Sequence, residues 1–398
     1  TVYVPGEKPR DAVIVDDVSL RLARGKVMGL IGESGAGKST IGLAALAFGR
    51  GGIRLSGGKI VLNGREIRTA GPGALRKLRG REVTYVAQSA AAAFNPAKRI
   101  MHQVIEATLH HNLCSQSEAE DRAVDLFRTL NLPDPENFGK RYPHQVSGGQ
   151  LQRAMTAMAL CPRPDLVIFD EPTTALDVTT QIEVLAAIKT AIIETGVSAL
   201  YITHDLAVVA QVSDEIMVLR QGKMVEHGTV QQIIEAPREE YTRALISVRA
   251  VQHEEKKPTD TPLLRARSIS ARYGAMAVDV LSDVSVDLYA GQTLALVGES
   301  GSGKSTMARV ITGLLPPRAG DILFEDKPLP PSLNNRSREE LRQLQMIYQM
   351  ADTAMNPRQT VQTIIGRPLE FYFGLRGRKR DARVQELLDA IELGKGFA

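Results

Sequence analysis

The sequence predicts an α/β fold with a largely parallel sheet, built as two tandem copies of one module. The first observation is a repeat: the nonapeptide Gly32–Thr40, GESGAGKST, returns as Gly298–Thr306, GESGSGKST. The second is an alternation of short apolar runs, expected to be strands, with longer segments of helical periodicity. With 398 residues, 43% of them hydrophobic, the chain is long enough for two domains that each bury a core.

Strands are expected at five short apolar runs. These are Val27–Ile31, Val83–Ala87, Leu166–Phe169, Ala199–Thr203 and, before the second nonapeptide, Thr293–Val297. Residues 100–142 interrupt this alternation of expected strands and helices. Within them, Ser117–Leu130 carries apolar residues at helical spacing. We therefore expect an inserted helical subdomain over about residues 96–160.

The repeat extends beyond the nonapeptides and defines the domains. The segment DVSV that begins at 283 lies 266 residues after DVSL at 17, which is also the spacing of the nonapeptides. Farther on, Gln349 follows Gln88 by 261 residues, as the Asn-Pro pair at 356 follows the pair at 95. Residues 251–262 are polar and contain two prolines, which is typical of a linker. We predict a first domain over residues 1–250, a linker over 251–262 and a second domain over 263–398.

Composition excludes several classes of protein. The sequence has no run of about 18 apolar residues, the length that a membrane-spanning helix needs. Its two cysteines, Cys114 and Cys161, lack metal-type spacing, which argues for a reducing cytoplasm and against zinc or iron–sulfur sites. The net charge of +4 fits either an anionic membrane surface or nucleic acid and does not distinguish them.

Each nonapeptide fits the phosphate-loop pattern G-x-x-x-x-G-K-[ST] after an expected strand. Glycines let the backbone wrap closely around phosphates, so that amide groups and the following helix N-terminus face them. Lys38 and Lys304 are expected to reach the β- and γ-phosphates, and Ser39 and Ser305 to ligate Mg²⁺. A glycine-rich turn with a chance lysine does not account for two matches in the same context. The predicted nucleotide-binding residues of the loops are Gly32, Ser34, Gly35, Ala36, Gly37, Lys38, Ser39, Thr40, Gly298, Ser300, Gly301, Ser302, Gly303, Lys304, Ser305 and Thr306.

Polar residues follow the other expected strands of the first copy. Near a phosphate loop, Asp170 would hold Mg²⁺ through water, and Glu171 would orient or deprotonate the attacking water. His204 would contact the γ-phosphate, and Gln88 would contact the Mg²⁺ or the lytic water. For each residue alone, the ordinary alternatives are an acidic turn, a structural histidine and a solvated glutamine.

The segment Val146–Gln150, VSGGQ, precedes apolar residues at helical spacing, so an amphipathic helix is expected after it. At the start of that helix, Ser147, Gly148, Gly149 and Gln150 would present amide groups and the positive helix end, which suits an anion. Taken alone, the ordinary alternative is an N-capped helix without a ligand.

In their order and spacing, these segments resemble the ATPase subunits of ABC transporters. The correspondence covers essentially the whole chain: Walker A at Gly32–Ser39, the Q-loop at Gln88, the signature at Val146–Gln150, Walker B at Leu166–Asp170, the catalytic glutamate at Glu171, the D-loop at Thr174–Asp177 and the switch histidine at His204. The signature has Val146 where the family usually has leucine, which is a conservative change.

The resemblance implies a fold, cofactors and a mode of pairing. The expected fold is a P-loop NTPase domain of the ABC type, with a RecA-like core, an antiparallel β subdomain and an inserted helical subdomain, in two tandem copies. ATP and Mg²⁺ are the expected cofactors, with Gln88 and Gln349 near the metal and Tyr3 and Tyr273 stacked on adenine. Two ATPase domains, within or between chains, would pair head to tail, with each nucleotide between one phosphate loop and the opposite signature.

Finer features resemble the importer group for oligopeptides, dipeptides and nickel: the Asn-Pro pairs after the two Q-loops, Arg141–His144 before the signature and Tyr241–Arg243 near the end of the first domain. This implies two membrane-spanning permease subunits, a substrate-binding protein, a peripheral place at the cytoplasmic face of the inner membrane and peptide as the substrate class. The alternative is an ABC ATPase that acts on nucleic acid or ribosomes. The short linker, the cysteine pattern and an aromatic content of 5% disfavour it, so no nucleic acid partner is expected.

The second copy is expected to be incomplete, and this has a measurable consequence. Val146 follows Asn95 by 51 residues, so a second signature is expected near residue 407, beyond Ala398. The chain would then be a C-terminally truncated form of a protein of roughly 500 residues or more, since such domains have about 250 residues. We predict that the 398-residue chain binds ATP but hydrolyses it poorly as an intramolecular pair. ATPase assays at several protein concentrations test this prediction, and brisk, concentration-independent turnover would contradict it.

Overall fold

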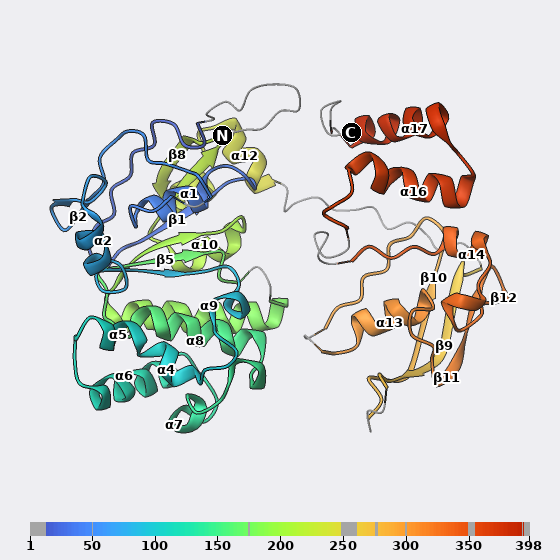
Figure 1. Ribbon diagram of the computed structural model, residues 1–398, viewed down its shortest axis with the longest axis horizontal. Helices are drawn as coiled ribbons and strands as arrows, with labels where there is room; N and C mark the ends of the chain where they lie inside the picture. The colour runs from blue at the N-terminus through green and yellow to red at the C-terminus, as the bar shows by residue number, and fades with distance from the viewer. Residues whose placement is uncertain are drawn as a thin grey trace. The chain divides into compact units, whose positions relative to one another are not determined.

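The computed structural model describes residues 13–49, 51–173, 176–247, 261–274, 278–298, 301–348, 355–391 and 393 (Figure 1). Contacts divide the chain into two compact units, which cover described residues 13–247 (unit one) and 261–393 (unit two). The predicted linker lies almost wholly outside the described residues, and the bounds of the two domains stay predictions.

The helices and strands of each unit follow in chain order. Unit one contains β1 (Val27–Ile31), α1 (Lys38–Ala44), β2 (Val61–Leu62), β3 (Arg65–Glu66), α2 (Pro72–Leu78), β4 (Val83–Val86), α3 (Ala90–Ala93), α4 (Ile100–Val104), α5 (Glu106–His110), α6 (Gln116–Thr129), α7 (Pro135–Phe138), η1 (Pro143–Gln145), α8 (Gly148–Leu160), β5 (Leu166–Asp170), α9 (Val178–Thr195), β6 (Ser198–Ile202), α10 (Leu206–Val212), β7 (Glu215–Arg220), β8 (Lys223–Thr229), α11 (Val230–Glu235) and α12 (Glu240–Ser247). Unit two contains β9 (Leu264–Ala271), β10 (Leu281–Leu288), α13 (Lys304–Ile311), β11 (Ala319–Phe324), β12 (Lys327–Pro328), η3 (Leu333–Asn335), α14 (Arg338–Gln343), α16 (Val361–Phe373) and α17 (Gly377–Ala390). In the described part of the chain, no helix combines the length and the apolar character needed to cross a membrane.

Unit one is built on a largely parallel sheet, which confirms the predicted α/β fold. In its described part, six strands lie in the order β4-β5-β6-β1-β7-β8, and β8 alone runs antiparallel to its neighbour. The central strand β1 pairs Val27 with Ala199 of β6 and Met28 with Glu215 of β7. Every residue of β1 and β6 is buried, as expected for strands covered on both faces.

Helices cover both faces of this sheet, and the sheet separates two hydrophobic clusters. On one face, Leu30 and Ile168 pack with Ile41 of α1. On the other face, Phe169 and Tyr201 pack in the larger cluster formed with α8, α9 and α10. Successive strand residues point to opposite faces, so a continuous apolar run such as β5 serves both clusters.

In the region of the predicted helical subdomain, α4 and α6 pack against α8. The expected helix at Ser117–Leu130 is observed as α6, which starts after Ser115 because a capping box with Glu118 satisfies its first amides. The rings of Phe127 and Phe138 pack edge to face, 5.2 Å apart, and join α6 to α7. The helix after the signature was expected to be amphipathic, but α8 is buried on nearly all sides because α3, α4, α6 and α9 pack against it.

Unit two contains an antiparallel sheet in the order β10-β9-β11-β12, with α13 packed against β9. The predicted strand at Thr293–Val297 is wrong: these residues form no strand, and Leu294, Leu296 and Val297 are exposed. In unit one the matching strand, β1, takes its hydrogen bonds from β6 and β7. No described strand pairs with 293–297, and an apolar run without partner strands has no ladder to join.

Close packing between β1 and α10 gives a test of this fold. A Cβ atom on Gly29 would lie 2.0 Å from Val209 Cγ2 and 2.8 Å from Ser213 Oγ. We predict that Gly29→Ala lowers the free energy of unfolding by about 1–3 kcal/mol, the usual cost of overpacking a filled core. Denaturant titration followed by circular dichroism measures it, with Gly57→Ala as the control because no atom lies within 4 Å of a Cβ at that position. Equal midpoints for the two variants would contradict the close packing.

Candidate nucleotide-binding and catalytic site

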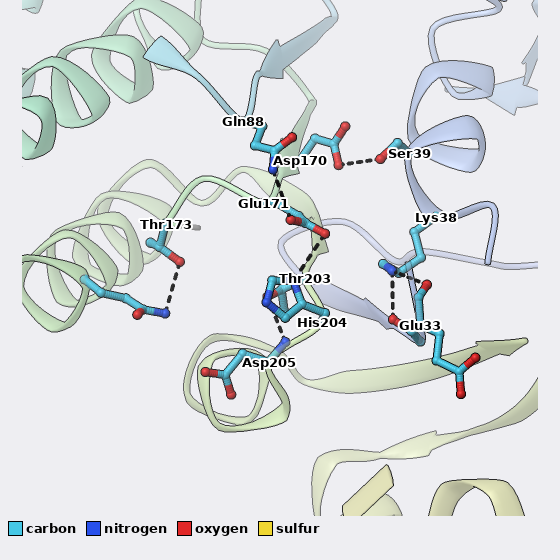
Figure 2. Close-up of polar contacts among 12 residues, drawn as sticks. Glu33, Lys38, Ser39, Gln88, Asp170, Glu171, Thr173, Thr203, His204 and Asp205 are labelled. Carbon is cyan, nitrogen blue, oxygen red and sulfur yellow. Dashed lines mark hydrogen bonds and ion pairs between the residues drawn. The ribbon is translucent and has the colours of Figure 1, made fainter. Parts of the chain in front are cut away.

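Four parallel strands of unit one end at the same edge of the sheet and bring the predicted site residues together (Figure 2). The loop before α1 follows β1, Gln88 follows β4, Asp170 and Glu171 end β5, and His204 follows β6. In open parallel sheets this carboxyl edge is where ligands bind.

The loop Gly32–Gly37 wraps back on itself before α1 begins. Gly32, Gly35 and Gly37 have φ values of 149°, 83° and 93°, in the range that favours glycine. A Cβ on Gly32 would lie 2.1 Å from Leu219 O, so the backbone passes too close for any side chain. Gly37 precedes α1 without a side-chain cap, which leaves the first amides of the helix without a side-chain acceptor.

Lys38 points back into this loop. Its ammonium donates hydrogen bonds to the carbonyl oxygens of Gly32, at 2.8 Å, and Glu33, at 2.9 Å. The residue is only 5% exposed, and burial lowers the pKa of its ammonium although Glu171 and Asp170 oppose that shift. A buried cation favours an anionic partner strongly, because little water competes for it.

Ser39 and Asp170 supply oxygen ligands of the kind that Mg²⁺ prefers. Ser39 Oγ donates a hydrogen bond of 2.8 Å to Asp170 Oδ1, and Tyr85 donates its hydroxyl hydrogen to Oδ2. No cluster of three or more His, Cys, Asp or Glu side chains suited to a metal occurs among the described residues. This donor set fits Mg²⁺, which binds through one or two protein oxygens, substrate phosphates and water.

Glu171 lies between the two other predicted catalytic residues. Gln88 Nε2 donates to Glu171 Oε2 at 3.4 Å, and His204 Nδ1 lies 3.4 Å from Oε1 (Figure 2). The Glu171 backbone is left-handed, with φ 49°, and its amide donates to Ile202 O on β6. Glu171 thereby lines the same cavity as residues of the phosphate loop.

Most of these groups border one cavity of about 290 Å³. Its lining residues are Ile14, Ser34, Gly35, Gly37, Lys38, Ser39, Thr40, Gln88 and Glu171. Among the predicted loop residues, Ala36 instead points into the core, where it is 3% exposed. The arrangement can receive a polyphosphate beside a cation, two oxygen ligands and a general base.

The segment Ser147–Gln150 does not line this cavity. Ser147 caps α8 through a capping box with Gln150, in which each side chain accepts a hydrogen bond from the other's amide. Gly149 is required for packing, since a Cβ there would lie 2.3 Å from Thr180 Cγ2 on α9. Within unit one, therefore, the structure does not bring the predicted signature to the phosphate loop.

Comparison with known proteins decides the family. A family model for the ABC transporter matches residues 15–174 and 281–396. The glutathione import ATP-binding proteins of Escherichia coli (strain K12) and Shigella sonnei are each 34% identical over 425 residues, covering 95% of this chain and 68% of theirs. This chain belongs to the ABC transporter ATPase family. Its resemblance to the family, its ABC-type fold and its class as an ATPase are thereby confirmed.

Solved structures are also similar. One is a dimeric ATP-binding cassette in a post-hydrolysis state bound to ADP and Pi, with a TM-score of 0.49 and 24% identity over 56% of this chain and 94% of that one. Another is a dimeric bacterial ABC transporter cassette, with a TM-score of 0.48 and 25% identity over 55% of this chain and 90% of that one.

In the second phosphate loop, the described glycines repeat the backbone angles of the first. Gly298, Gly301 and Gly303 have φ values of 156°, 86° and 95°, and α13 begins at Lys304 as α1 begins at Lys38. Lys304 Nζ donates to Gly298 O at 2.7 Å and lies 3.4 Å from Ser302 Oγ. Ser305, the predicted metal ligand, is exposed beside it, whereas Thr306 is buried.

Tyr273, the predicted adenine-stacking residue of this copy, has polar partners near the same loop. Its hydroxyl lies 3.2 Å from Thr306 Oγ1 and accepts a hydrogen bond of 3.0 Å from Arg309. The other predicted residues Tyr3, Ser300 and Gln349 lie outside the described residues, as do residues 174 and 175 of the D-loop.

Two tyrosines contact residues of the candidate site in unit one, although no role was predicted for either. Tyr85 reaches Asp170, and Tyr241 of α12 accepts a hydrogen bond of 3.3 Å from the Glu33 amide while Arg220 lies 4.7 Å from its ring centroid. The sequence offered a signal for Tyr85, because its polar hydroxyl lies on an apolar strand close to Gln88, a predicted metal contact. The contact of Tyr241 joins residues 208 apart, and no local pattern indicates it.

The two lysines allow a test of the phosphate loops. We predict that Lys38→Ala and Lys304→Ala each weaken nucleotide binding at one loop by about 1.5–3 kcal/mol, because a charge-assisted contact to phosphate is lost. Titration of each variant with a fluorescent nucleotide measures this effect. Lys223→Ala is the control, since Lys223 is exposed and pairs with Asp16 outside the cavity. Wild-type affinity at both loops in the two loop variants would contradict the assignment.

Proposed function

We propose that this chain is the ATP-binding and ATP-hydrolysing subunit of an ABC importer, in which unit one carries the hydrolytic residues. The observation that carries the proposal is the cavity where Lys38, Ser39, Gln88 and Glu171 meet at the carboxyl edge of the sheet. We assign residues 1–250 to the first ATPase domain, with a helical subdomain over about 96–160, and 263–398 to part of a second.

In this proposal, each group at the edge of the sheet has one task. Lys38 binds the β- and γ-phosphates, whereas Ser39 and, through water, Asp170 would hold Mg²⁺, which would neutralise charge on the phosphates. Glu171 takes a proton from the attacking water as its oxygen bonds to the γ-phosphorus and the bond to the β–γ bridging oxygen breaks. Gln88 and His204, each 3.4 Å from the Glu171 carboxylate, orient that carboxylate and the water.

We further propose that a facing ATPase domain completes the nucleotide-binding site. Support comes from Ser147–Gln150, whose helix end lies outside the cavity of its own unit. Head-to-tail pairing of two ATPase domains, within or between chains, would bring such a helix end to the phosphates of the opposite site. Pairing and separation would then follow ATP binding and hydrolysis, the switch that drives transport.

The substrate is proposed to be a peptide or a related small solute. The relatives of this chain are named as glutathione import proteins, and glutathione is itself a small peptide. The expected partners are two membrane-spanning permease subunits and a substrate-binding protein. The chain would then sit peripherally at the cytoplasmic face of the inner membrane.

The Glu171→Gln variant tests catalysis and transport together. The amide cannot accept the proton of the lytic water, so we predict that ATP hydrolysis falls by about 10² or more while ATP binding persists. The assay uses the chain assembled with its permeases in proteoliposomes, and measures phosphate release and uptake of labelled peptides. Glu183→Gln serves as the control, since this glutamate on α9 is exposed and does not line the cavity.

The possible results separate the parts of the proposal. Unchanged phosphate release in Glu171→Gln would show that Glu171 is not the base. Normal hydrolysis by the wild type without ATP-dependent uptake of any peptide would refute peptide as the substrate class and leave the catalytic assignment standing.

A further inference from the structure

Tyr85 reaches the proposed metal ligand from the neighbouring strand. On β4, Tyr85 is in register with Ile168 of β5, and Asp170 lies two residues farther along the same face. The tyrosine ring packs in the apolar cluster that contains Ile168. Its hydroxyl donates a hydrogen bond of 2.5 Å to Asp170 Oδ2. Because the core fixes the ring, the position of the hydroxyl is fixed as well.

The carboxylate of Asp170 is consequently held from two sides. Ser39 Oγ donates to Oδ1, and the hydroxyl of Tyr85 donates to Oδ2. Asp170 is only 7% exposed, so water is a poor substitute for either donor. The terminal torsion of an aspartate is broad, so its orientation depends on such partners. Loss of the tyrosine hydroxyl would leave one buried oxygen without this donor and free the carboxylate to turn.

We propose that Tyr85 is a positioning residue that keeps Asp170 Oδ1 directed at Ser39 and the first turn of α1, where Mg²⁺ would bind. The inference rests on the proposed role of Asp170 in holding Mg²⁺, directly or through water. Hydrogen-bond donors behind a metal ligand commonly change metal affinity by about 10-fold or more when they are removed.

The second copy differs from the first at this position. With the 261-residue offset that relates Gln88 to Gln349, Tyr85 corresponds to Met346. Methionine fills apolar space but donates no hydrogen bond. The positioning contact is therefore a property of the first copy, and we expect nucleotide binding at the two phosphate loops to depend differently on Mg²⁺.

The experiment measures how much Mg²⁺ strengthens nucleotide binding at the first loop. All variants carry Glu171→Gln, which prevents turnover, and Lys304→Ala, which weakens the second loop. The dissociation constant of a fluorescent ATP analogue is measured in EDTA and at saturating Mg²⁺, and the ratio of the two reports the coupling. We expect Tyr85→Phe to leave the constant in EDTA unchanged and to lower the ratio about tenfold.

A neighbouring residue provides the matched control. Thr84 precedes Tyr85 on β4, faces the opposite side of the sheet and is buried, and its hydroxyl has no hydrogen-bond partner in the described part of the chain. Thr84→Val keeps its shape and should leave both constants unchanged. Thermal unfolding of both variants checks that the strand is intact.

Asp170→Asn separates failure of this inference from failure of the proposed site. A lowered ratio in Asp170→Asn, with no further loss when Tyr85→Phe is added, supports the positioning role. An unchanged ratio in Asp170→Asn would show that Asp170 is not the ligand. If Asp170→Asn lowers the ratio but Tyr85→Phe does not, or if Tyr85→Phe weakens binding equally in EDTA, the role of Tyr85 is overturned.

Discussion

A hydrogen bond from Ser39 Oγ to Asp170 Oδ1 joins two parts of unit one that lie 131 residues apart in sequence, and the site depends on it. Strand β6 lies between β1 and β5, so Ser39 reaches Asp170 only because α1 packs over β6 and β5. Gly42 permits that approach: a Cβ there would lie 2.7 Å from Ile202 Cδ1 and 3.0 Å from Ile168 Cγ2. The contact between Ser39 and Asp170 therefore depends on how closely the short helix α1 packs onto the sheet.

The polar groups of the site hydrogen-bond to one another, and this sets the energetics of ligand binding. Lys38 donates to two loop carbonyls, Asp170 accepts from Ser39 and Tyr85, and Glu171 lies within 3.4 Å of two polar side chains. Phosphate oxygens and Mg²⁺ would exchange with these internal partners rather than add to them. Each contact then contributes a difference between two hydrogen bonds, which is why removing one lysine is expected to cost only a few kcal/mol.

Local sequence was sufficient to predict the phosphate loops, because glycine at defined positions sets their backbone. The φ values of Gly37 and Gly303 differ by only 2°, although the strand before the second loop is not formed. Strands β1, β4, β5 and β6 were also predicted to within one residue at each end, since their apolar runs are buried on both faces. These elements were enough to place Gln88, Glu171 and His204 at one edge.

The features that the sequence did not predict depend on contacts between residues that are far apart in the chain. An apolar run such as 293–297 becomes a strand only where other strands pair with it, and its own residues do not reveal whether they do. The role of Tyr85 likewise comes from the register of β4 on β5, which sets its hydroxyl opposite Asp170. Two loops of nearly identical sequence can therefore differ in chemistry, because the proposed metal-holding carboxylate and its donors come from other strands. We therefore expect the activity of each copy to follow from the residues that surround its loop, since the loop motif accounts only for the proposed binding of phosphate.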